Sequence, residues 1–170
     1  MSMSMLRFHS LDGLLLQRLT VIYDAQSQWR QAAGVLAKAA SAPDLGQAFS
    51  AQESEAAISL SSLEKVFELL GGSAERMPSQ AMAGLVAECL AVAQAQGEAK
   101  VRDAALIAAA QCAQQYKITS CRTLEIFAQQ LGKLEAAQVL KRVLTQETAA
   151  QDRLALIARA HVNIEARDAA

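Results

Sequence analysis

Apolar residues recur at spacings of three and four along most of the chain, which is the pattern of amphipathic helices. One such row runs through Leu15, Leu19 and Ile22. Residues that break or end helices interrupt the pattern at four places: Pro43, Gly71 with Gly72, Gly97 and Gly132. We therefore predict five helices, over residues 11–40, 44–70, 79–96, 98–131 and 134–163.

Four of the predicted helices are long, and the one over residues 79–96 is short. At a rise of 1.5 Å per residue, the long helices reach about 40–50 Å. Long helices joined by short loops form a bundle, and the short helix then carries the chain across it between the second and third long helices. We predict one all-α domain with its core over residues 11–163. A helical repeat protein is disfavoured, because no segment recurs along the chain.

Composition and charge agree with this architecture and exclude several functions. The chain has 170 residues, of which 52% are hydrophobic and 4% aromatic, with only eight glycines and two prolines. Its net charge of −1 argues against nucleic-acid binding, which usually needs a basic face, and gives no support for an electrostatic membrane anchor. No stretch approaches about 18 uninterrupted apolar residues, so no membrane span is expected.

Cysteine usage indicates a reducing compartment. The three cysteines, Cys89, Cys112 and Cys121, are an odd number without CxxC spacing. They predict neither a disulfide framework nor a zinc site, and we expect buried, small apolar side chains. The first residues lack the pattern of a secretory signal. We therefore expect a cytoplasmic protein.

Polar residues interrupt the apolar row of each long helix near its middle. In chain order they are Gln26, then Gln52 and Glu55, then Gln114 and Lys117, and last Gln146 and Glu147. Buried groups of this kind cost free energy unless they are paired. Because four helices place them at similar depth, the sequence predicts one shared polar layer. Tyr23 and Tyr116 lie beside it, Trp29 is assigned to the core or a dimer surface, and Ser59 to close helix packing.

Two main interpretations of this layer compete. A dinuclear iron or manganese site needs a Glu on two helices and Glu-x-x-His on the other two. The sequence offers Glu55 and Glu147 at this depth, while His9 and His161 lie near the chain ends. In the second interpretation the amides form a hydrogen-bonded network, and Lys117 neutralises Glu55, Glu147 or both. A bound small molecule or a single weakly held ion is a third possibility.

Several stretches together resemble the YciE/YciF-type ferritin-like proteins, which are bacterial helical bundles linked to stress responses. The stretches are residues 19–28 (LTVIYDAQSQ), 62–71 (SLEKVFELLG), 103–111 (DAALIAAAQ) and 129–132 (QQLG). The resemblance covers most of the chain, about residues 11–158. It implies a ferritin-like four-helix bundle with an added crossover helix, a dimeric assembly, and central ligands similar to those of di-iron carboxylate proteins.

The chain departs from the family pattern on every long helix. Gln26 stands for a Glu, Gln52 for a His, Ser54 for a Glu, Gln114-Gln115-Tyr116-Lys117 for Glu-His-Tyr-Glu, and Gln146-Glu147 for an acidic pair. A Glu-to-Gln change removes the charge that a metal needs, and Lys117 introduces a cation where a cation would bind. These departures predict that no metal or other cofactor is bound.

We therefore expect a non-catalytic ferritin-like bundle that has lost its dinuclear metal site. It would serve as a stress-linked interaction or scaffold protein, with a homodimer as its assembly and an unidentified protein partner. One alternative is a di-iron or di-manganese protein, an oxidase, a peroxidase or a metal handler, that uses Glu55 and Glu147 with Glu53 and water. Another alternative is a module that binds a small hydrophobic ligand.

Overall fold

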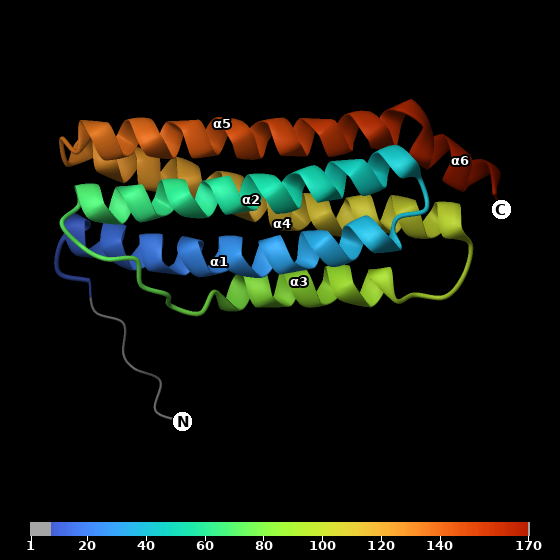
Figure 1. Cartoon of the computed structure of the whole chain (residues 1–170), viewed down its shortest axis with the longest axis horizontal. Coiled ribbons are helices and arrows are strands. Elements are labelled where there is room, and N and C mark those ends of the chain that lie inside the picture. Colours follow the sequence, from blue (N-terminus) through green and yellow to red (C-terminus); the bar gives the residue numbers. More distant parts are fainter. Residues whose placement is uncertain (1–7, 170) are drawn as a thin grey trace, which may run out of the picture.

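The computed structural model describes residues 8–169, and in this part of the chain it is helical without strands (Figure 1). The helices are α1 (Leu11–Ala39), α2 (Pro43–Leu69), α3 (Gln80–Ala93), α4 (Ala99–Gln130) and α5 (Leu134–Ile157), followed by a π-helical turn, η1 (Ala158–Val162), and α6 (Asn163–Asp168). The prediction of an all-α fold with four long helices and one short helix is confirmed.

The four long helices close a ring around one core. Helix α1 packs on α2, α2 on α5, α5 on α4, and α4 on α1. The short helix α3 lies outside this ring, against α1 and α4, as Figure 1 shows. It carries the chain from the end of α2 to the start of α4, which confirms the predicted bundle with a crossover helix.

Two glycines end long helices where the sequence predicts an end. Gly71, after α2, has φ of 78°, and the following Gly72 N–H donates to the Phe67 carbonyl at 2.9 Å. Gly132, after α4, has φ of 68°, and the Lys133 N–H donates to the Ala128 carbonyl at 2.8 Å. Only glycine adopts this left-handed conformation without steric cost, so it supplies the sharp reversal that short connections require.

The start of α3 is fixed by hydrogen bonds to the helices beneath it. Ser79 is buried, its hydroxyl lies 3.1 Å from the Tyr116 hydroxyl of α4, and it accepts from the Met82 N–H at 3.3 Å. Its own N–H donates to the Asp24 carboxylate of α1 at 2.8 Å. These bonds hold the crossover helix in register with α1 and α4, and they give Tyr116 a structural partner outside the centre of the bundle.

Two sequence predictions are wrong in detail. The last helix is not continuous over residues 134–163, because α5 ends at Ile157 and η1 intervenes before α6. Cys112 is exposed, whereas Cys89 and Cys121 are buried as predicted. Cys112 and Cys121 are nine residues, or 2.5 turns, apart on α4, so they point to opposite sides of the helix.

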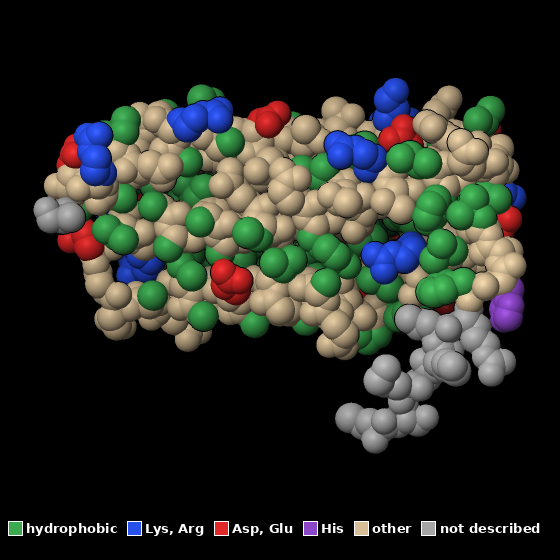
Figure 2. All heavy atoms as spheres, turned by 180° about the vertical axis from the view of Figure 1, so that it is seen from behind, with side chains coloured by type: hydrophobic (Ala, Val, Ile, Leu, Met, Phe, Trp, Pro, Cys, Tyr) green, Lys and Arg blue, Asp and Glu red, His purple; other side chains and the backbone are tan. Residues whose placement is uncertain are grey.

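The surface carries scattered charges of both signs. On the face opposite to the view of Figure 1, acidic and basic side chains alternate with apolar ones and form no large field of one sign (Figure 2). Among the described residues, no helix combines the length and the apolar character needed to cross a bilayer.

Candidate functional site

A buried ion pair lies in the middle of the bundle. Glu147 of α5 is 3% exposed, and Lys117 of α4 is 2% exposed. The Lys117 Nζ lies 2.8 Å from the Glu147 Oε2. Two opposite charges at this separation, shielded from water, attract each other strongly, and each compensates the cost of burying the other.

Amide and hydroxyl donors from the other helices complete the surroundings of the carboxylate. Gln26 of α1 donates to Oε1 of Glu147 at 2.5 Å, and Gln114 of α4 donates to Oε2 at 2.5 Å. Gln114 also reaches the Glu147 backbone carbonyl at 2.8 Å, and the Ser59 hydroxyl of α2 lies 3.3 Å from Oε1. Glu147 therefore joins all four long helices in one polar layer.

The electrostatics of this layer favour an ionised carboxylate. Burial alone raises the pKa of Glu147, but the Lys117 ammonium and the hydrogen bonds from Gln26 and Gln114 outweigh burial, and the pKa lies below its usual value. The neighbouring Cys121 thiol has its pKa raised, first by burial and then by the charge of Glu147. Cys121 is consequently a neutral thiol beside the layer rather than a thiolate ligand.

An aromatic ring supports the ammonium group from another side. Trp29 of α1 is fully buried, and the Lys117 Nζ lies 5.0 Å from the centroid of its ring. At this separation the negative face of an indole attracts a cation, and the attraction is stronger where water is excluded. Lys117 is therefore held by a carboxylate and an aromatic face together.

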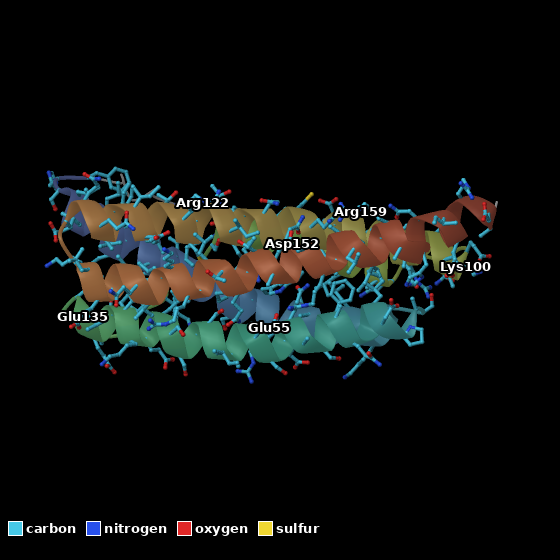
Figure 3. All side chains as sticks on the ribbon, turned by 90° about the horizontal axis from the view of Figure 1, so that it is seen from above. Glu55, Lys100, Arg122, Glu135, Asp152 and Arg159 are labelled. Carbon is cyan, nitrogen blue, oxygen red and sulfur yellow. The ribbon has the colours of Figure 1, made fainter. Side chains whose placement is uncertain are left out.

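A second group of polar side chains lies at the edge of the layer, between α2 and α5 (Figure 3). Gln146 donates to the Glu55 backbone carbonyl at 2.7 Å and lies 3.3 Å from the Ser59 hydroxyl. The Glu55 carboxylate pairs with Arg153 at 2.5 Å, and both side chains are partly exposed. Of the two partners expected for Lys117, the structure therefore provides Glu147 and not Glu55.

Several residues assigned to the layer lie elsewhere. Ser54 and Gln115 are exposed, so their placement in a polar core is wrong. Each lies next to a less exposed residue, and because consecutive residues of a helix are rotated by about 100°, an error of one position is enough to exchange an inward side chain for an exposed one.

Gln52 is buried as predicted, at 2% exposed, but its amide makes no hydrogen bond within the described residues. Tyr23 donates to Glu64 at 2.6 Å, outside the layer.

Two residues of this site contact the polar layer in addition to the role predicted for them. Trp29 lies in the core, as predicted, and its ring also contacts Lys117. Ser59, assigned to close helix packing, is buried and also lies within hydrogen-bond distance of Glu147. The signal for Ser59 was present, since it lies four residues after Glu55 and seven after Gln52 on the same row. No sequence pattern marked Arg153 as the partner of Glu55, because these residues are 98 positions apart.

The donor set does not fit the dinuclear metal site that the resemblance implies. Within residues 8–169, no group of three or more His, Cys, Asp or Glu side chains converges in a way that could hold a metal ion. The Glu53 carboxylate is exposed and lies beside Gly34, and Glu55 is held by Arg153. Hard cations prefer several charged oxygens, whereas this layer has one central carboxylate, already paired with an ammonium group.

Comparison with known proteins identifies the family. A family model described as a domain of unknown function, DUF892, matches residues 10–167. The chain belongs to this family. It is 36% identical over 162 residues to protein YciF of Escherichia coli strain K12, covering 95% of this chain and 98% of YciF. The resemblance to YciF-type proteins that the sequence indicates is therefore confirmed.

Solved structures of similar proteins agree with the fold. The crystal structure described as that of the Escherichia coli stress protein YciF matches with a TM-score of 0.88 and covers 92% of this chain and 99% of YciF. YcfI from Rhodopseudomonas palustris is 29% identical, with a TM-score of 0.84, over 91% of this chain and 96% of its own. A protein from Xanthomonas campestris, 16% identical with a TM-score of 0.75 over 94% and 97%, shares the fold.

Proposed function

We propose that this chain is a non-catalytic member of the DUF892 family in which an internal ion pair has replaced a dinuclear metal site. One observation carries the proposal: the buried Lys117 ammonium lies 2.8 Å from the Glu147 carboxylate, the one buried carboxylate in the middle of the described bundle. An ammonium group and a divalent ion in one pocket of low dielectric repel each other strongly. The protein then acts through its surface, as a stress-linked interaction or scaffold protein.

The remaining contacts of the layer support the same proposal. Gln26 and Gln114 present amide N–H groups to the carboxylate, so they donate to it rather than offering oxygens to a cation. A dinuclear centre with a single carboxylate would leave most of the metal charge uncompensated. The stress-linked part of the proposal rests on similarity to YciF, which is described as a stress protein.

The two alternative functions lack a supporting contact. A metal-dependent oxidase, peroxidase or metal handler would need Glu53, Glu55 and Glu147 to converge, but Glu55 is bonded to Arg153 and Glu53 lies exposed beside Gly34. A core site for a small hydrophobic ligand would need space beside the layer, where the fully buried Trp29 indole packs over Lys117. Neither arrangement favours a second candidate function.

Metal content tests the proposal directly. The protein is expressed with added iron and manganese, purified without chelators, and analysed by elemental mass spectrometry. We expect less than about a tenth of an equivalent of either metal, because Lys117 already supplies the positive charge that Glu147 balances. One or two equivalents, or oxidase or peroxidase turnover by the purified protein, would overturn the proposal.

A matched variant provides the positive control. Gln26→Glu/Gln114→Glu/Lys117→Glu removes the ammonium group and adds three carboxylates at positions that contact Glu147. Four clustered carboxylates repel each other unless a cation binds, so we expect this variant to retain about one equivalent of metal or more. If the folded variant binds none, the layer is not a converted metal site.

The assembly and compartment are part of the same proposal. A cytoplasmic homodimer without nucleic-acid or membrane ligands is supported by the family resemblance, by the prevalence of twofold symmetry, and by the net charge of −1. Sedimentation equilibrium at neutral pH checks the assembly, with twice the chain mass of 18.1 kDa expected. A monomer throughout the concentration range would exclude the dimer.

A further inference from the structure

The C-terminal part of the chain leaves the regular helix at a π-helical turn. The turn η1 follows α5 and precedes the short helix α6. A π turn accommodates an extra residue and so rotates the side chains that follow, and such turns often occur at functional positions. Here the turn contains His161, whose ring lies between the start of α2 and α6.

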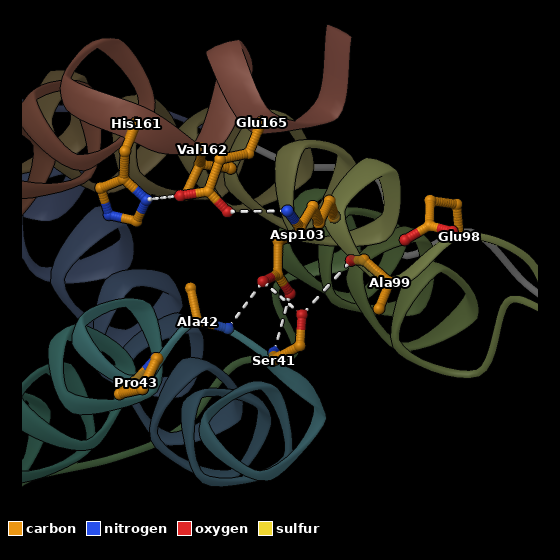
Figure 4. A pocket seen from close by; sticks show the side chains of 10 residues that line it. Ser41, Ala42, Pro43, Glu98, Ala99, Asp103, His161, Val162 and Glu165 are labelled. Atoms are coloured by element: carbon orange, nitrogen blue, oxygen red, sulfur yellow. Dashed lines mark hydrogen bonds and ion pairs between the residues drawn. The ribbon is translucent and has the colours of Figure 1, made fainter. Parts of the chain in front are cut away.

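Both ring nitrogens of His161 face carboxylates. Nε2 lies 2.7 Å from the Asp44 Oδ2 in the first turn of α2, and Nδ1 lies 3.1 Å from the Glu165 Oε1 of α6 (Figure 4 shows the second contact). A neutral imidazole has one N–H and one lone pair, so it can donate to only one of these carboxylates. Both hydrogen bonds form together only when the ring is a protonated imidazolium.

Each neighbouring element contributes charges to this environment. Helix α4 contributes Lys100, whose Nζ lies 3.7 Å from the Glu165 Oε2, and Asp103. Glu98, the residue before α4, lines the same cavity of about 330 Å³ as these two residues. The side chain of Asp103 is already occupied, because it accepts hydrogen bonds from Ser41 and Ala42 (Figure 4).

Helix α5 contributes Arg153, which lines a neighbouring cavity together with Asp44. The His161 side chain is 33% exposed, so protons reach it from solvent.

We propose that His161 is a pH-sensitive clamp that fastens η1, and through Glu165 the following α6, to the start of α2 when its ring is protonated, and that loosens α6 when the ring loses its proton. Loosening opens the cavity walled by Ser41, Pro43 and Val162, and it uncovers Val162 of η1, which is 3% exposed while the clamp is closed. The clamp uses no residue of the central layer, so it does not depend on whether that layer binds a metal.

The direction of the pH response follows from the two partners. The hydrogen bond to Asp44 has the largest effect on the pKa of His161 and raises it; burial opposes this, but the hydrogen bond to Glu165 and the charges of both carboxylates add to the rise, so the pKa lies above its usual value. The clamp is therefore complete below the usual pKa of histidine and is lost as pH rises through the raised value. At the acid end, His161 lowers the pKa of Asp44, so the clamp persists until that carboxylate is protonated.

Backbone NMR relaxation of the full chain tests the clamp. The ¹⁵N heteronuclear NOE of the α6 amides, residues 163–168, is measured at about pH 5.5 and pH 8.5, on either side of the histidine range. The wild-type protein should show ordered α6 amides at the lower pH and mobile ones at the higher pH, while α5 stays ordered. The same order at both pH values would overturn the proposal.

Variants assign the response to the ring. His161→Gln keeps at most one neutral donor, so its α6 mobility should not change between the two pH values. His9→Gln removes the other histidine of the sequence and should leave the wild-type response intact. If His161→Gln retains the response, or His9→Gln abolishes it, the clamp is excluded.

The size of the effect is fixed by linkage. The docking equilibrium of α6 changes tenfold for each pKa unit by which docking raises the pKa of His161. Titration of the His161 ring protons in the wild type and in Asp44→Asn measures the part of that difference that Asp44 supplies, and the pKa should fall in the variant. An unchanged pKa would show that Asp44 does not hold the protonated ring.

Discussion

A lysine in the middle of a helical bundle is stable there only through its partners. Removing an ammonium group from water costs several kcal/mol even after relaxation. Lys117 recovers this cost from the Glu147 carboxylate at 2.8 Å and from the Trp29 face at 5.0 Å. The dependence is mutual, because Glu147 without Lys117 is a buried charge held only by neutral donors.

Removing the ammonium group should therefore destabilise the fold. In Lys117→Met the volume is nearly kept but Glu147 loses its counter-charge, and we expect a loss of about 3–5 kcal/mol in the free energy of unfolding. Urea denaturation at neutral pH measures it. Lys65→Met is the matched control, since the Lys65 side chain is 58% exposed and its pair with Glu68 contributes within about 0.5 kcal/mol.

A double variant separates charge from packing. Adding Glu147→Gln to Lys117→Met removes the stranded charge while Gln26 and Gln114 keep a polar partner, so most of the lost stability should return. A loss below about 1 kcal/mol in Lys117→Met would contradict a buried pair. No recovery in the double variant would mean that the loss came from packing.

Thiol reactivity should distinguish the three cysteines. Cys112 is exposed, whereas burial raises the pKa of Cys89 to about 11 and also raises the pKa of Cys121. Because the thiolate is the reactive form, we expect one of the three thiols to react rapidly with Ellman's reagent in the folded protein and all three after unfolding. Cys112→Ser should abolish the fast phase. A fast phase that survives would place the reactive thiol elsewhere.

At the scale of helices, the sequence predicts those features that nearby residues determine, such as helix ends. The ends of α2 and α4 follow from Gly71 and Gly132, and the crossover follows from the short helix between them. The π turn at Ala158–Val162 was missed, because neither glycine nor proline marks it. Ser54 was misplaced because a shift of one residue turns a side chain by about 100°.

Contacts between helices were the least predictable part of the site. The existence of a polar layer follows from the sequence, because the apolar rows of four long helices are interrupted at similar depth. Periodicity alone does not say which side chains of the layer bond to each other, among Gln26, Gln114, Lys117 and Glu147. The sequence left Glu55 and Glu147 as equal partners for Lys117. The choice depends on Arg153, which lies 98 positions from Glu55 and neutralises it in the folded state only.

Two glycine-to-alanine substitutions should change the free energy of unfolding in opposite directions. Gly132 has φ of 68°, so Gly132→Ala should cost about 1 kcal/mol of stability, whereas Gly84 lies inside α3 with open space around it. Gly84→Ala should stabilise by about 0.5–1 kcal/mol, because alanine favours the helix and has fewer unfolded conformations. Urea denaturation of both variants checks the pair. If both variants changed stability in the same direction, the assigned helix end at Gly132 would be contradicted.

At the scale of the whole molecule, one charge connects the elements of the ring. Glu147 receives hydrogen bonds or a salt bridge from α1, α2 and α4 while it belongs to α5. Protonating it therefore weakens contacts among all four long helices at once. Loss of this charge should appear as a change in global stability rather than as local fraying.

Acid should unfold the protein partly through Glu147. Its pKa is lower in the folded chain than in the unfolded chain, so the unfolded state binds more protons in acid. Its contribution to stability is therefore complete above the unfolded pKa and is lost as pH falls through the folded value, by about 1.4 kcal/mol for each unit of difference. The free energy of unfolding, measured by urea denaturation from about pH 7 to pH 3, tests this. Lys117→Met/Glu147→Gln lacks the Glu147 carboxyl, whereas all other carboxyls are common to both proteins. The variant should therefore lose less stability than the wild type over the same pH range. Equal losses would show that Glu147 is not held in its charged form by the layer.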